Sequence, residues 1–196
     1  VGGENAALIA TGLKAKVYIV DKSTKRLQQL KEIFGNTIIP KQSDEVDLKK
    51  LISECVLLIG GVLIPGAEAP KLVTKDMLKF MKRGSVIVDV AIDQGGCIET
   101  SKPTTHANPI YIIDGIVHYC VTNMPGAVPR TSTIALNKVT IPFLSKLADK
   151  GYEKALREDK NFLAGLNVFK GQVTYKAVAD AFGYKYVSPK EALTNV

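Results

Sequence analysis

Residues 1–21, VGGENAALIATGLKAKVYIVD, place a glycine-led helix directly before an apolar strand that ends in an acid. The small residues after Gly3 allow that helix to lie close to a sheet, and residues 16–21 are a β-branched run typical of buried strands. Asp21 ends the strand where a dinucleotide-binding unit holds the ribose hydroxyls, and its charge favours NAD over NADP. We therefore predict the later part of a Rossmann unit whose first strand the sequence lacks. The alternative is that Gly3 only begins a helix and Asp21 only caps the next one.

Strand-like and helix-like segments alternate from this stretch as far as residue 121. Ser23 is a typical N-cap of a helix that Gly35 ends, and Thr74 and Gly84 bound a later helix in the same way. Such alternation is typical of an α/β fold, here a Rossmann-type doubly wound parallel sheet. The remaining segments expected in it are a helix over residues 44–53 and strands over residues 37–40, 55–60, 85–90, 110–115 and 116–121.

The pattern changes after NMPGAVPRTST, residues 123–133, where the chain becomes helical. We expect one long helix over residues 131–150 and shorter helices over residues 152–159 and 175–182. A helical segment that follows a completed sheet is expected to pack against a different part of the protein.

Composition excludes several classes of protein. The 196 residues, 46% of them apolar, are enough for a globular core, and no apolar run approaches the roughly 20 residues that span a bilayer. The net charge of +7 comes from dispersed lysines without an aromatic-interleaved basic cluster, so no nucleic-acid partner is expected. Cys55, Cys97 and Cys120 are widely spaced and odd in number, which indicates a reduced, cytoplasmic setting and no metal site.

Two loops follow predicted strands at the edge of the sheet where open α/β folds bind ligands. GGVLIPGAEAPKLVT, residues 60–74, is expected to offer backbone groups and apolar surface to a flat ring, unless it is only a structural turn. Asp93 lies beyond the strand of residues 85–90 and could point into the cleft, where an acid can shuttle a proton or pair with a cationic group. Asp89 is expected to be structural, because it lies within the strand.

Three other residues could take part in chemistry, each with a plain structural alternative. His106 and His118 are the two histidines, and neither has a partner nearby in the sequence, so an acid–base role and a structural role both remain open. Arg130 could clamp a carboxylate or could simply be an exposed charge at a helix start.

Four segments together resemble the family of alanine dehydrogenases and transhydrogenase NAD-binding subunits, and within it the alanine dehydrogenases. They are VLIPGAEAPKLVT (62–74), GSVIVDVAIDQGGCIE (84–99), PTTHANP (103–109) and NMPGAVPRTST (123–133). The resemblance covers essentially the whole chain but only the C-terminal part of the family's length. The transhydrogenase subunit shares the LIPG-type loop, but it lacks the aspartate of AIDQGG and differs at NMPGAVPRTST, so the alanine dehydrogenases are the better match.

The resemblance implies NAD-dependent, reversible oxidative deamination of the small-molecule substrate L-alanine to pyruvate and ammonium by a homo-oligomer, a hexamer in the full-length family. It implies a catalytic role for Asp93, a substrate contact at Asn123, and NAD contacts at Gly3, Asp21, Arg26, Ser43, Val62, Leu63, Val90 and Met124. Neither histidine matches the family's catalytic histidine, which belongs to the N-terminal region.

The implied domains are an N-terminally truncated NAD-binding Rossmann domain over residues 1–129 and, over residues 130–196, the helical C-terminal part of a split substrate domain. Because the first domain is missing from the sequence, we expect this chain alone to be inactive. A nucleotide-binding fragment without activity and a transhydrogenase subunit remain the alternatives.

Overall fold

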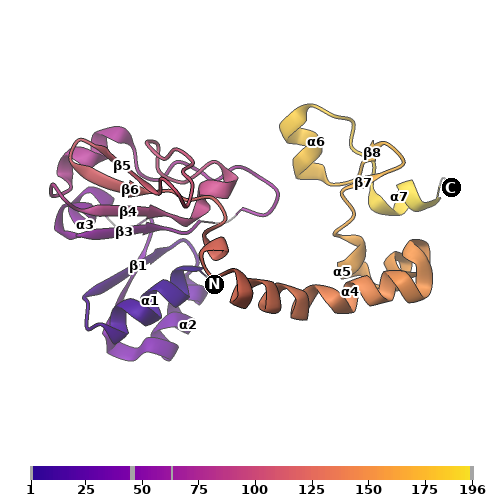
Figure 1. Ribbon diagram of the computed structural model, residues 1–196, viewed down its shortest axis with the longest axis horizontal. Coiled ribbons are helices and arrows are strands. Elements are labelled where there is room, and N and C mark those ends of the chain that lie inside the picture. The colour runs from indigo at the N-terminus through magenta and orange to yellow at the C-terminus, as the bar shows by residue number, and fades with distance from the viewer. Residues whose placement is uncertain (1, 45–46, 63, 195–196) are drawn as a thin grey trace. The chain divides into compact units, whose positions relative to one another are not determined.

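The computed structural model describes residues 2–44, 47–62 and 64–194 (Figure 1). The chain divides into two compact units. The first comprises Val1–Leu63 and Glu68–Asn123, and the second comprises Ile64–Ala67 and Met124–Val196.

The first unit contains the alternating helices and strands. In chain order its elements are α1 (Gly2–Gly12), β1 (Val17–Asp21), α2 (Thr24–Phe34), η1 (Gly35–Thr37), β2 (Ile38–Gln42), α3 (Leu48–Glu54), β3 (Leu57–Gly60), η2 (Lys75–Phe80), β4 (Val86–Asp89), η3 (Val90–Gln94), β5 (Ile110–Ile113) and β6 (Ile116–Tyr119), where η marks a 3-10 helix. Each predicted strand of the sequence has a counterpart in this list.

The strands form two sheets that are mainly parallel (Figure 1). β1 pairs with β2 in parallel, and the second sheet has the order β3–β4–β6–β5, in which β3, β4 and β6 are parallel. Only the edge strand β5 runs antiparallel, because Asp114 and Gly115 both have positive φ angles and close a tight hairpin to β6. Helix α1 packs against both β1 and β3, one from each sheet. The prediction of an α/β fold with parallel strands and crossover helices is confirmed.

The caps of α2 are confirmed, whereas the predicted helix over residues 74–84 is wrong. Ser23 accepts the backbone N–H of Arg26, and Gly35 ends α2. The later segment is only the short 3-10 helix η2, and Thr74 does not cap it with its side chain. Met81 takes an extended conformation and is buried, so the helix ends before Gly84. Gly84 instead turns the chain into β4 and donates its N–H to the carbonyl of Gly115 over 2.8 Å.

The core of the first unit lies between the β3–β4–β6 strands and the segments that cover them. Its buried members come from α3, η2, the strands and the loops after β3 and β4, namely Ile52, Ala69, Val73, Leu78, Met81, Ile87, Ala91, Cys97, Ile98 and Ile116. Full burial of a side chain such as Ile87 contributes about 1.5–3 kcal/mol to the stability of the fold. Because residues of the loops after β3 and β4 belong to this core, the core also holds those two loops in place.

The second unit is largely helical. It contains η4 (Met124–Ala127), α4 (Pro129–Glu158), α5 (Lys160–Leu163), the hairpin strands β7 (Val168–Phe169) and β8 (Gln172–Val173), α6 (Lys176–Phe182) and α7 (Pro189–Thr194). α4 is broken at Gly151, whose φ of 71° and ψ of 160° are not helical, and this break separates the two helices expected on either side of it. The hairpin, α5 and α7 were not predicted, because each is too short to show a periodic pattern.

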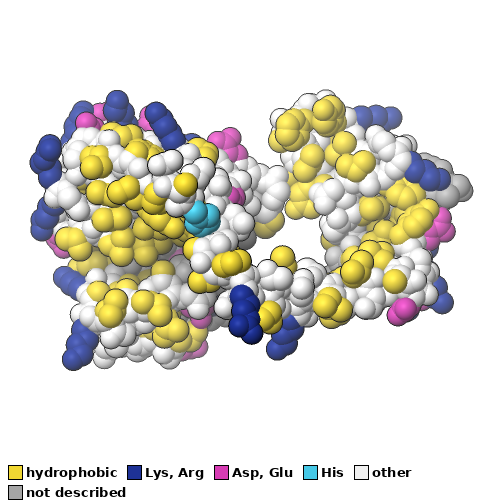
Figure 2. Space-filling model, in the orientation of Figure 1, with side chains coloured by type: hydrophobic (Ala, Val, Ile, Leu, Met, Phe, Trp, Pro, Cys, Tyr) yellow, Lys and Arg dark blue, Asp and Glu magenta, His cyan; other side chains and the backbone are white. Residues whose placement is uncertain are grey.

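Helix α4 leaves many apolar side chains uncovered. Six large ones are 46–65% exposed, and Figure 2 shows apolar side chains on the visible surface of the helix. They are Ile134, Leu136, Val139, Ile141, Phe143 and Leu144. Such a run of exposed apolar side chains is typical of a surface that packs against another protein surface. None of the described helices is both long enough and apolar enough to cross a membrane.

Candidate functional site

The first turn of α1 lies beside the carboxyl ends of β3 and β4. A Cβ built on Gly61 would lie 3.8 Å from the backbone nitrogen of Gly3, and one built on Gly2 would lie 3.7 Å from Cγ1 of Val90. A Cβ built on Gly3 itself meets nothing within 4 Å. The amides of the first helical turn lack partners within the helix and attract anions. The first turn of α1 and Gly61, called the glycine cradle below, thus place backbone N–H groups of the kind that bind a pyrophosphate beside two strand ends.

The ends of β1 and β2 meet at Asp21 and Ser43. Oδ1 of Asp21 accepts the N–H of Ser23 over 2.8 Å, and its carbonyl oxygen accepts the N–H of Ser43 over 3.0 Å. The N-cap of α2 is Ser23 and not Asp21, although Asp21 stabilises the turn that precedes the helix. Asp21 therefore lies at the end of β1, and one of its carboxylate oxygens stabilises the turn into α2.

Arg26, in the first turn of α2, forms an ion pair that the sequence did not indicate. Its Nη2 lies 2.6 Å from Oε2 of Glu4 in the first turn of α1, and its Nη1 lies 3.2 Å from Oε1 of Gln29. The Arg26 and Glu4 side chains are 34% and 33% exposed. Two helices that both border the candidate cofactor site are thereby joined by a pair of opposite charges.

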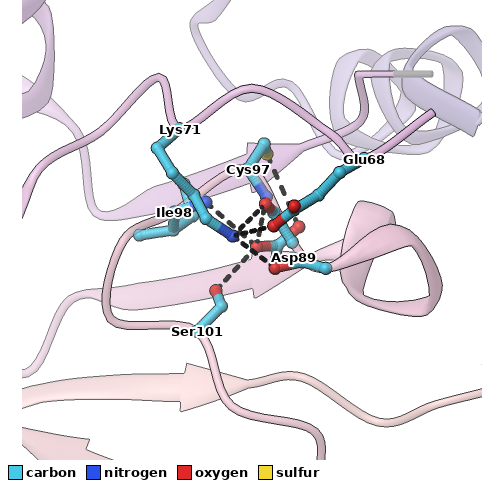
Figure 3. Close-up of polar contacts among 8 residues, drawn as sticks. Glu68, Lys71, Asp89, Cys97, Ile98 and Ser101 are labelled. Atoms are coloured by element: carbon cyan, nitrogen blue, oxygen red, sulfur yellow. Dashed lines mark hydrogen bonds and ion pairs between the residues drawn. The ribbon is translucent and has the colours of Figure 1, made fainter. Parts of the chain in front are cut away.

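The buried carboxylate of Asp89 organises the loop after β4 (Figure 3). It accepts the N–H groups of Ala91, Cys97 and Ile98 at 3.1, 2.9 and 3.2 Å and the hydroxyl of Ser101 at 2.6 Å. Asp89 is fully buried and every one of these donors comes from the loop that follows it. The structural role expected for Asp89 agrees with this geometry.

Lys71 joins the loop after β3 to the loop after β4, and these two loops carry three of the eight predicted cofactor contacts (Figure 3). Its Nζ donates to the carbonyl oxygens of Gly95 and Gly96, the second at 2.8 Å, and lies 3.7 Å from a carboxylate oxygen of Glu68. The loop after β3, which contains Val62, is therefore tied to the loop after β4, which contains Val90 and Asp93.

Cys97 is a packed thiol and not a nucleophile. Burial, together with the neighbouring Asp89 carboxylate, raises the pKa of Cys97 to about 12, so the reactive thiolate is absent near neutral pH. A Cβ on Gly60 would lie 2.4 Å from its sulfur, so the sulfur fills the space that glycine leaves at the end of β3.

Asp93 and Asn123 are in direct contact although they are far apart in the sequence. Oδ1 of Asp93, in η3, accepts the N–H of Asn123 over 3.2 Å, and Asn123 has a φ of 50° in the left-handed region. The carbonyl oxygen of Asn123 lies 3.2 Å from Nε2 of His106, which must donate this bond because a carbonyl only accepts. The fold thus adds His106 to the two residues that the resemblance implied, and both Asp93 and His106 are exposed.

His118 is a core residue. It is fully buried, its Nδ1 donates to the carbonyl of Ile116 over 3.0 Å, and its Nε2 lies 2.8 Å from the hydroxyl of Thr100. Its ring stacks on that of Tyr111 at 5.0 Å. Burial lowers the pKa of His118 from its usual 6.5, so it stays neutral and structural. Arg130 is exposed in the first turn of α4.

The predicted site residues therefore fall into groups. Gly3 and Val90 border the glycine cradle with Gly61, Asp21 and Ser43 lie at adjacent strand ends, and Asp93 contacts Asn123. Val62 packs against the core of the first unit. Met124 begins η4 in the second unit, and Leu63 lies outside the described residues. The residues that sequence reasoning missed are Glu4 and the contact made by His106, neither of which has a local signal.

Comparison with known proteins places this geometry in a family. The model of the family described as "Alanine dehydrogenase/PNT, C-terminal domain" matches residues 1–176. An alanine dehydrogenase of Halomonas elongata is 59% identical over 187 residues, which cover 95% of this chain and 50% of that protein. The chain spans about half the length of the curated relatives it matches.

Solved structures give the same picture. A structure of L-alanine dehydrogenase superposes with a TM-score of 0.82 and 46% identity over 92% of this chain and 50% of that one. A transhydrogenase from Sinorhizobium meliloti superposes with a TM-score of 0.64 and 27% identity over 75% of this chain and 42% of that one.

Proposed function

Because the chain belongs to the alanine dehydrogenase/PNT C-terminal domain family, we propose that it is the cofactor-binding and C-terminal part of an alanine dehydrogenase. The C-terminal domain of this family is its NAD-binding domain, and NAD is therefore the cofactor. The proposed reaction is the reversible oxidative deamination of L-alanine to pyruvate and ammonium.

The observation that carries the proposal is the hydrogen bond between Asp93 and the backbone of Asn123. It brings the two residues with proposed catalytic and substrate-binding roles to one place, at the edge of the sheet where open α/β folds bind their ligands. The same contact argues against a transhydrogenase subunit, in which the resemblance places no aspartate at this position.

The residues of this chain have separate parts in the proposed mechanism. NAD supplies the acceptor for the hydride that leaves the α-carbon of alanine. Asp93 holds or moves a proton at the amino group and at the hydroxyl group formed when water adds to the resulting imine. Asn123, with its backbone fixed by Asp93 and His106, orients the substrate with its side chain.

The proposed cofactor contacts come from four places. The amide of Gly3 receives the pyrophosphate, the carboxylate of Asp21 takes the ribose hydroxyls, and Arg26 flanks the adenine. The remaining contacts are proposed for Ser43, Val62, Leu63, Val90 and Met124.

We further propose that residues 1–129 form the NAD-binding domain and that residues 130–196 complete a substrate domain. The exposed apolar residues of α4 support this division, because an apolar helix face is typical of a helix that packs within a domain. For the whole protein we propose a cytoplasmic enzyme that assembles as a homo-oligomer, a hexamer. On this proposal the 196-residue chain by itself turns over no alanine, and robust alanine-dependent NADH formation by that chain alone would refute it.

The test compares two aspartate substitutions in the protein as it is naturally made. We expect Asp93→Asn to lower kcat for alanine-dependent NADH formation by about 10²–10⁴-fold, while the dissociation constant for NAD changes little. Asp76→Asn is the matched control, because Asp76 is an exposed acid of η2 that pairs only with Lys79 in the described contacts. Unchanged turnover in Asp93→Asn would overturn the role of Asp93. Hydride exchange between NADH and NADP, with no turnover of alanine, would favour the transhydrogenase alternative.

A further inference from the structure

The ion pair between Arg26 and Glu4 lies at the border of the proposed ribose site. The two charged atoms are 2.6 Å apart, the side chains are each about one-third exposed, and the residues are separated by 22 positions in the sequence. Glu4 stands one residue after Gly3, whose amide borders the proposed pyrophosphate cradle. The pair therefore lies beside the proposed cofactor site.

Arg26 and Asp21 belong to the same short turn. Asp21 accepts the N–H of Ser23, and the hydroxyl of Ser23 accepts the N–H of Arg26 over 3.2 Å. Both side chains therefore start from one hydrogen-bonded segment between β1 and α2. A ligand group bound at the end of β1 would therefore lie near both Asp21 and Arg26.

An arginine close to this strand end is the group that dinucleotide-binding folds use to accept the 2′-phosphate of NADP. Its planar guanidinium matches a phosphate with two parallel hydrogen bonds. In this structure the guanidinium is already engaged, since Nη2 binds Glu4 and Nη1 binds Gln29. A 2′-phosphate would have to compete with the Glu4 carboxylate and would also be repelled by it.

We propose that Glu4 is a specificity-determining residue that excludes NADP by keeping Arg26 engaged. Asp21 repels the 2′-phosphate directly, and Glu4 removes the nearby cation that would otherwise compensate for that repulsion. The inference rests on the proposed placement of the cofactor at the ends of α1 and β1. It goes beyond that placement because it assigns the selection against a 2′-phosphate to a residue of the first turn of α1.

A purely structural pair would behave differently. A partly exposed ion pair contributes little to stability, and Glu4 is also favourably placed at a helix N-terminus without Arg26. Removing its charge would then leave the ratio of NADP to NAD affinity as it was. The ratio is the readout that separates the two roles.

The experiment measures the dissociation constants of NAD and NADP by titration calorimetry on the protein as it is naturally made. The variants are Glu4→Gln, the double variant with Arg26→Ala, and Glu32→Gln as a control that removes a negative charge from α2. We expect Glu4→Gln to raise the affinity for NADP relative to NAD by about tenfold, the effect of one charge-assisted contact, and less at high salt. Glu32→Gln should leave the ratio near that of the unaltered protein.

Adding Arg26→Ala should abolish the gain, because the arginine is the group that Glu4 withholds. The inference fails if Glu4→Gln leaves the ratio unchanged, or if the gain persists without Arg26. If the unaltered protein binds neither dinucleotide, the proposed cofactor site fails and the inference fails with it. Normal NAD binding with an unchanged ratio overturns only the role of Glu4.

Discussion

Replacing Asp89 by asparagine tests whether one buried carboxylate holds the loop that carries Asp93. The carboxylate offers two oxygens to three backbone N–H groups and one hydroxyl, and the residue is fully buried. Asparagine keeps one oxygen and turns an NH₂ group toward the remaining donors. At least one buried donor then loses its acceptor, at about 1–3 kcal/mol for each such group, and the surviving bonds lose their charge assistance.

We therefore expect Asp89→Asn to lower the free energy of unfolding by about 3 kcal/mol. The assay is urea unfolding followed by far-UV circular dichroism and by the fluorescence of the seven tyrosines, since the chain has no tryptophan. The dissociation constant for NAD should also rise, because Val90, a proposed NAD contact, belongs to the same loop. Asp76→Asn is the control and should unfold at the same urea concentration as the unaltered protein. A midpoint for Asp89→Asn that matches the control would refute the account of this loop.

Three further predictions concern the packing and titration of the first unit. Gly60→Ala should lower the free energy of unfolding in urea by about 1–3 kcal/mol, because the new Cβ would lie 2.4 Å from the sulfur of Cys97. Adding Cys97→Ala should restore most of the loss. If it restores nothing, another contact causes the destabilisation. With its pKa raised to about 12, Cys97 should resist alkylation by iodoacetamide in the native protein at mildly alkaline pH and should react after unfolding. Peptide mass mapping measures both reactions. Rapid labelling of the native protein would contradict the burial of Cys97. Burial lowers the pKa of His118 in the folded state, so the unfolded chain binds more protons than the folded chain once the pH drops below 6.5. The free energy of unfolding should therefore fall as the pH is lowered from 6.5 to the pKa of His118 in the folded protein. His118→Gln should reduce that fall in urea unfolding at several pH values, and an identical pH profile would exclude the contribution of His118.

Local patterns predicted the elements whose causes are local. Ser23 and Gly35 bound α2 because a cap is a hydrogen bond between residues three or four positions apart, which sequence spacing reveals directly. The break at Gly151 is of the same kind, since the residue takes a backbone conformation that glycine alone adopts freely. Thr74 and Gly84 carried the same signals, yet the burial of Met81 ended that helix early, and burial depends on what the rest of the chain brings near.

The sequence by itself therefore determined the α/β class, the membership of the family and the identity of the candidate residues, because alternation, capping and motifs are written in neighbouring positions. Only the tertiary structure brought Asp93 to Asn123, His106 to the same backbone, and Glu4 to Arg26. Those contacts depend on the order of parallel strands and on the left-handed backbone at Asn123, which no stretch of neighbouring residues specifies. The physical reason is that these side chains contact residues distant in the sequence, which only the fold of the whole chain brings near. A helix cap, in contrast, bonds a residue within one helical turn.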